Sequence, residues 1–103
     1  MKELARKLIT MIKAHEGKNF DAILQDKMED RAGFSFMSRV KCGDVHFHPE
    51  RLMVSEPITG NYFCLPLNGI KEIHDETTGK DDVAFTVTYN HNYEVFIQIF
   101  QPF

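Results

Sequence analysis

The spacing of apolar residues changes near residue 33, and this change limits what the chain can fold into. The first fifteen residues carry apolar side chains at helical spacing, whereas from Phe34 to Phe100 apolar and polar residues alternate in short runs separated by turn signals. Alternation with a period of two is typical of half-buried antiparallel strands. The sequence therefore predicts an α+β fold, with an N-terminal amphipathic helix (or two) packed on a strongly bent antiparallel sheet or small open barrel of about five to seven strands.

Length and composition indicate one ordinary folded domain over 1–103. The chain has 103 residues, 43% of them apolar and 26% charged, and no linker, repeat or low-complexity stretch divides it. These values are close to globular averages and argue against disorder. No apolar stretch approaches the ~20 residues of a membrane span, and no signal peptide is recognisable. Two cysteines, Cys42 and Cys64, predict free, buried thiols in a cytoplasmic protein.

A helix is predicted over 2–15. Leu4, Leu8, Met11 and Ile12 share one face, and charged residues occupy the other. This spacing is that of a surface helix with one buried stripe, and Gly17 is a natural stop.

Residues 19–31 fit two different elements. Phe20, Ile23, Leu24 and Met28 would share a face of a second helix, which the absence of valine and threonine favours. The alternative is a strand in which Phe20, Ala22 and Leu24 alternate with polar residues. We expect the helix and keep the strand as the alternative.

The strand pattern reverses at Gly43-Asp44. Before it the even positions are apolar, and after it the odd positions Val45 and Phe47 are. An unbroken strand cannot exchange its buried face, so a turn or bulge is predicted here, with a two-residue hairpin as one option. The residues expected in the core before the reversal are Phe34, Phe36, Val40 and Cys42.

The two C-terminal strands, 83–89 and 93–100, are predicted to form a hairpin. In the last strand Phe96 and Phe100 lie on the face opposite to the other apolar residues. A strand that is apolar on both faces needs cover on both. We expect either the N-terminal helix or another subunit to cover Phe96 and Phe100, which makes them candidate partner-interface residues.

His46 and His48 form the sharpest local signal in the sequence, and it is a spacing used by metal sites. Alternate positions of a strand project both imidazoles from one face, and imidazole nitrogen is a common metal ligand. Further ligands would have to come from Cys64, His74 or His91, which nothing in the sequence brings near. Two solvent-facing histidines are the simpler interpretation.

Charge is distributed unevenly along the chain. Residues 1–18 carry a net charge of +3 and residues 19–103 a net charge of −6. The basic helix makes nucleic-acid binding an alternative, although the acidic remainder would repel phosphates and the sequence does not favour it. No nucleophile elbow, phosphate loop or dinucleotide glycine pattern is present, so no catalytic residue or cofactor is predicted.

The segment 62–73 resembles small barrels of the Sm-like kind and GRAM-type pleckstrin-like domains, in which an aliphatic-Pro-x-x-x-Ile segment recurs in a strand. The resemblance covers about a dozen residues, and the Sm RNA-binding residues are missing. It implies no function or site residue for this chain.

These features favour a non-enzymatic protein-binding or assembly module, with a protein partner or a second copy meeting Phe96 and Phe100. The alternatives are a metal-binding protein or metal-dependent enzyme that uses His46 and His48, and a nucleic-acid binder that uses the basic helix.

Overall fold

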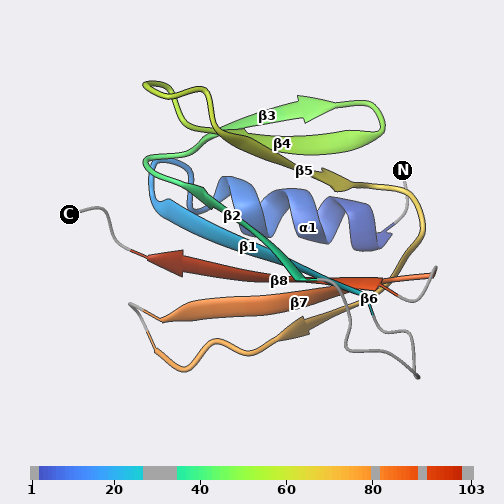
Figure 1. Cartoon of the computed structure of the whole chain (residues 1–103). Coiled ribbons are helices and arrows are strands. Elements are labelled where there is room, and N and C mark those ends of the chain that lie inside the picture. Colours follow the sequence, from blue (N-terminus) through green and yellow to red (C-terminus); the bar gives the residue numbers. More distant parts are fainter. Residues whose placement is uncertain (1–2, 27–34, 80–81, 91–92, 101–103) are drawn as a thin grey trace.

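A computed structural model of the chain describes residues 3–26, 35–79, 82–90 and 93–100, with one helix and eight strands among them. Among these described residues the N-terminal helix is followed only by strands (Figure 1). The elements are α1 (Glu3–Lys13), β1 (Asn19–Asp26), β2 (Ser35–Val40), β3 (Asp44–His48), β4 (Arg51–Ser55), β5 (Tyr62–Pro66), β6 (Ile70–Asp75), β7 (Val83–Tyr89) and β8 (Tyr93–Phe100).

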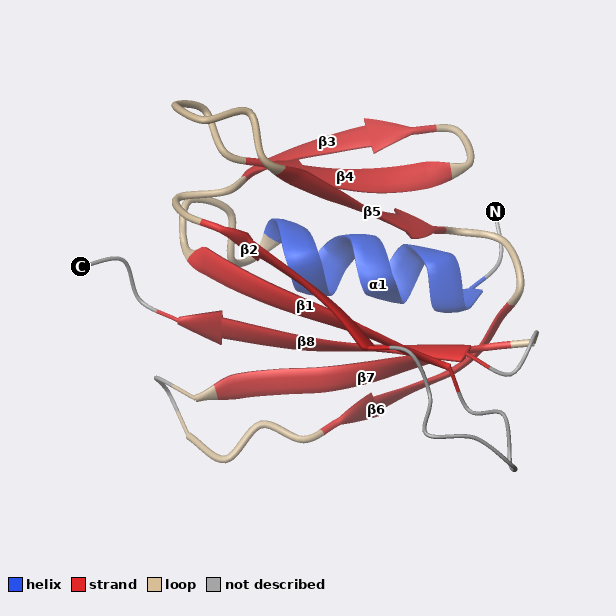
Figure 2. Ribbon diagram, in the orientation of Figure 1, coloured by secondary structure: helices blue, strands red, loops and turns tan. Residues whose placement is uncertain are grey.

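The strands form two antiparallel sheets, which are not closed into a barrel. The larger has the order β2-β1-β8-β7-β6 and the smaller has the order β3-β4-β5. The sheets approach each other at β2 and β5, where Ser38 Oγ donates to the Tyr62 carbonyl oxygen over 3.3 Å. On the other side α1 contacts both β6 and β3, and it lies between the two sheets (Figure 2). The predicted α+β class is confirmed, with the strands divided between two sheets.

Helix α1 forms where its apolar stripe predicts it, within the expected 2–15. Ala5, Leu8 and Ile12 are buried, and Arg6 and Lys7 are exposed. The buried stripe meets the inner faces of both sheets in one core. That core includes Phe20, Val40, Leu52, Val54, Phe63, Leu65, Phe85, Val87, Val95, Ile97 and Ile99.

Residues 19–26 form strand β1, so the helix expected over 19–31 is wrong for this part and the alternative is right. Phe20 and Ala22 are buried. The strand pairs with β2 on one side and β8 on the other along its length. Backbone pairing on both edges outweighs the weak helix propensity of the segment. Residues 27–31 lie outside the described residues.

At Gly43-Asp44, where the apolar positions change parity, the chain crosses from the five-stranded sheet to the three-stranded sheet. It is not a hairpin, because β2 pairs with β1 and β3 pairs with β4. Cys42 was expected in the core, but it is exposed and adopts a positive φ of 51°. Strand β2 ends at Val40, so its alternation no longer governs Cys42. Phe34 and the side chain of Phe36 lie outside what the structure describes.

The C-terminal hairpin is confirmed. Strands β7 and β8 pair in register, and Phe85, Val87, Ile97 and Ile99 point toward the core.

Within the part of the chain that the structure describes, no helix combines the length and apolar character that crossing a membrane requires.

Candidate functional site on the outer faces of the two sheets

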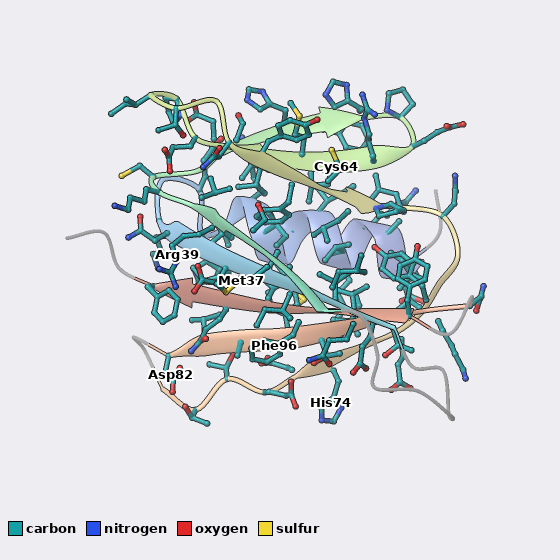
Figure 3. The ribbon with its side chains drawn as sticks, in the orientation of Figure 1. Met37, Arg39, Cys64, His74, Asp82 and Phe96 are labelled. Carbon is teal, nitrogen blue, oxygen red and sulfur yellow. The ribbon has the colours of Figure 1, made fainter. Side chains whose placement is uncertain are left out.

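The outer face of each sheet, opposite to the core, carries the candidate residues. On the five-stranded sheet the strand register sets Met37, Ile23 and Phe96 side by side on β2, β1 and β8. We call these three residues the apolar row. The same line continues through Thr86 on β7 to His74 on β6. Met37, Phe96 and His74 are labelled across this sheet in Figure 3.

The apolar row is not covered by the helix. Helix α1 packs on the inner face with Ile97 and Ile99, so the expectation that it covers Phe96 and Phe100 is wrong. Met37 is 60% exposed. Ile23, Phe96 and Phe100 are half-buried. Neighbouring strands shield them in part, since outward side chains on adjacent strands lie about 5 Å apart.

An ion pair lies beside the apolar row, in the next line of outward residues. Arg39 Nε donates to Asp21 Oδ1 over 2.9 Å, and Arg39 Nη2 donates to Asp21 Oδ2 over 3.2 Å. The carboxylate raises the pKa of Arg39, first through these hydrogen bonds and then through its charge. Asp21 is 8% exposed, so this two-point contact satisfies a buried carboxylate.

The opposite edge of the same face is acidic. On β6, Glu72 and His74 point outward beside Thr88 and Thr86. Just beyond β6, Glu76 Oε2 accepts a hydrogen bond of 2.7 Å from Thr86 Oγ1. The face therefore has the Arg39–Asp21 ion pair on β2 and β1 and carboxylates at its β6 edge. The apolar row crosses it between polar residues such as Gln98 and Thr86.

The outer face of the three-stranded sheet brings together residues far apart in the sequence. His46, Met53 and Cys64 lie side by side on β3, β4 and β5. Cys64 was expected in the core, but it is half-buried on this outer face, because Phe63 and Leu65 take the inward positions (Figure 3). The pairing of β4 with β5 produces this neighbourhood, and the sequence alone does not reveal it.

The two histidines of β3 differ in their surroundings. His46 is exposed, and its Nε2 lies 3.1 Å from Ser55 Oγ. His48 is half-buried, and its Nε2 is buried without a hydrogen-bond partner. Among the described residues, no three histidine, cysteine, aspartate or glutamate side chains group closely enough to hold a metal ion. His74 lies on the other sheet, and His91 is outside the described residues.

The basic side chains of α1 are exposed but partly matched by nearby carboxylates. Lys13 Nζ lies 2.8 Å from Glu16 Oε1. The pKa of Asp75 is lowered, mainly by hydrogen bonds from Thr77, with a smaller contribution from the charge of Lys7. Nucleic-acid binding by this helix stays a prediction.

A loop over 56–61 presents the most exposed of the large apolar side chains described. Ile58 is 94% exposed. The loop is held by the buried Glu56 carboxylate, which accepts hydrogen bonds from the Lys41 backbone N–H over 2.7 Å and from Thr59 Oγ1. The hydrogen bond from Thr59 and then that from Lys41 lower the pKa of Glu56.

Comparison with protein-family models, with curated proteins and with solved structures finds no match to this chain. Its function has to be inferred from the surfaces described above.

Proposed function

We propose that this protein is a non-enzymatic assembly module whose five-stranded sheet packs, by its outer face, on the same face of a second copy. The apolar row carries this proposal. Met37, Ile23 and Phe96 form a continuous apolar line on a face that turns away from the helix and from the core. Contiguous apolar surface of this kind marks protein interfaces.

The dimensions of the face set the size of the interface. Five strands about 4.8 Å apart and about six residues long form a face of roughly 24 by 20 Å, a flat area of about 480 Å². Specific interfaces of standard size bury about 800 Å² from each partner, so a dimer formed by this face alone lies at the small, weak end of specific interfaces. Sheets that pack face to face align their strands within about 30°, so two such faces can meet over most of their extent.

Charge favours a second copy over an unrelated partner. A two-fold axis running parallel to the strands, between the two faces, places Phe96 over its counterpart and the β2 edge over the partner's β6 edge. One line of outward residues crosses the sheet through Arg39, Asp21, Gln98 and Ala84. The Glu76 backbone N–H donates to the Ala84 carbonyl oxygen, so Glu76 continues this line just beyond β6. The same axis therefore sets Arg39 of each copy over Glu76 of the other.

Arg39 is able to make this second contact. Its side chain is 61% exposed, and Asp21 uses only two of its five N–H donors. Arg39 would then contact Asp21 of its own copy and Glu76 of the other copy. These charge contacts would add specificity to a dimer whose contact area is mainly apolar.

Sedimentation equilibrium of the full chain tests the proposal. We expect a dimer for the natural protein and a monomer for Phe96→Glu, because the substitution places a charge at the centre of the buried face. Phe47→Glu is the matched control, since Phe47 is 53% exposed on β3, away from this face. A natural protein that stays monomeric at high concentration would contradict the proposal.

A mixing experiment tests the orientation. Arg39→Glu and Glu76→Arg should each weaken the dimer, because each places like charges at both contacts. An equimolar mixture should dimerise again, since one copy of each variant restores two opposite-charge contacts. A mixture that behaves as the sum of its components would exclude this two-fold arrangement.

A further inference from the structure

We infer that the outer face of the three-stranded sheet holds a site for monovalent copper, formed by the imidazoles of His46 and His48 and the thioether of Met53. This site lies on the other sheet from the proposed dimer face and does not depend on it. The inference rests on the strand register, on two details of the histidine surroundings and on the chemistry of the three donors.

The register brings the three donors together. His46 and His48 project from the same face of β3, and Met53 lies directly across from His46 on β4. Directly opposed residues of an antiparallel pair have Cβ atoms about 5 Å apart, and diagonal neighbours about 7–8 Å. Imidazole and thioether side chains are long enough to converge on one ion above the space between these three positions.

The hydroxyl beside His46 suits a ligand histidine. Ser55 Oγ lies 3.1 Å from His46 Nε2. When Nε2 carries the ring proton and donates it to this oxygen, Nδ1 keeps the lone pair that a metal needs. Histidines that bind metals usually have their second ring nitrogen held in this way. Ser55 would therefore act as a positioning residue.

The unpartnered nitrogen of His48 is the second detail. Its Nε2 is buried and makes no hydrogen bond to any described residue. A buried polar atom without a partner costs free energy, which a bound cation at this nitrogen would recover.

The donor set selects the metal. Thioether sulfur is a soft ligand that favours Cu(I), and imidazole also binds copper well. A typical zinc site would need a third histidine, a thiolate or a carboxylate as a ligand beside His46 and His48. Among the described residues, no three such side chains group closely enough to hold a metal ion. Cys64 is two strand spacings, about 10 Å, from His46, so it lies beside the site and is not one of its ligands.

Anaerobic competition with a chromophoric Cu(I) chelator tests the inference. Thiols bind Cu(I) by themselves, so the full chain is used with Cys42→Ser and Cys64→Ser as the common background. We expect about one equivalent of Cu(I) to be retained per chain. Removal of an outer hydrogen-bonding partner of a metal ligand costs about 10–100-fold in affinity. We therefore expect a loss in this range from Ser55→Ala and a larger loss from His46→Gln, His48→Gln or Met53→Leu.

Two matched variants control for general loss of histidine or methionine. Met37→Leu and His74→Gln remove the same side chains from the other sheet, and they should leave the Cu(I) affinity unchanged. Circular dichroism checks that each variant is folded, and Met53→Leu keeps the side-chain volume. Absence of retained Cu(I), equal effects of Met53→Leu and Met37→Leu, or retention of Zn(II) as tight as that of Cu(I) would each overturn the inference.

Discussion

At the scale of single residues, the passage between the two sheets depends on a glycine in a crowded place. A Cβ added to Gly43 would lie 2.6 Å from Val54 Cγ1 and 3.0 Å from Phe20 Cδ1, both in the core. The Gly43 backbone also donates to the Lys18 carbonyl oxygen and accepts from the Gly17 N–H, each over 2.9 Å. It therefore ties the segment after the helix to the start of β3.

We expect Gly43→Ala to lower the free energy of unfolding by about 1–3 kcal/mol, the usual cost of overpacking a core. Urea denaturation measures this change. Gly79→Ala is the matched control, because a Cβ there would meet nothing within 4 Å. Equal stability of the two variants would show that the contact at Gly43 relaxes without cost.

Glu56 should contribute a pH-dependent part of stability. Its pKa is lowered from the ordinary value of 4.5 by the hydrogen bonds from Thr59 and Lys41. As pH falls, the unfolded chain therefore takes up this proton before the folded chain does. The stabilisation is fully present above about pH 4.5 and is lost as pH falls through the lower folded-state pKa.

We therefore expect Glu56→Gln to be less stable than the natural protein at pH 7, and the difference to shrink below about pH 4.5. Urea titrations across this range measure it. Glu50→Gln, at the turn between β3 and β4, is the control for a carboxylate on the surface. A difference for Glu56→Gln that stays constant with pH would mean that its charge is not involved.

At the scale of elements, local patterns predicted α1 and the β7–β8 hairpin because the contacts that define them are close in sequence. The same patterns predicted a helix for 19–31, but within the described part, 19–26, pairing with β2 and with the distant β8 makes a strand. Long-range pairing also explains the candidate sites. Alternation placed Phe96 on the outer face, but only the register puts Met37 in line with it and Met53 beside His46.

Strand order predicts the order of hydrogen exchange. Amides of β1, which has paired strands on both sides, should exchange more slowly than those of β2, which pairs within its sheet only with β1. Hydrogen–deuterium exchange read by NMR, amide by amide, measures this difference. Amides of β2 as protected as those of β1 would indicate that β2 has a further pairing partner.

At the scale of the whole molecule, helix α1 and the inner faces of both sheets share one hydrophobic core. The outer faces of the sheets keep two separate groups of chemically distinct residues. The five-stranded sheet presents the apolar row, with the Arg39–Asp21 ion pair near one edge and carboxylates near the other, and the three-stranded sheet presents nitrogen and sulfur donors. Because different sheets hold these groups, variants on one face should leave the function of the other face intact.

The proposed dimer makes thermal stability depend on protein concentration. Association of folded copies stabilises them by mass action, so the midpoint of thermal unfolding should rise as the natural protein is concentrated. Phe96→Glu should unfold at a midpoint independent of concentration, while Phe47→Glu should keep the dependence of the natural protein. Differential scanning calorimetry over about a hundredfold range of concentration measures all three. A flat midpoint for the natural protein would mean that folded copies do not associate through the apolar row.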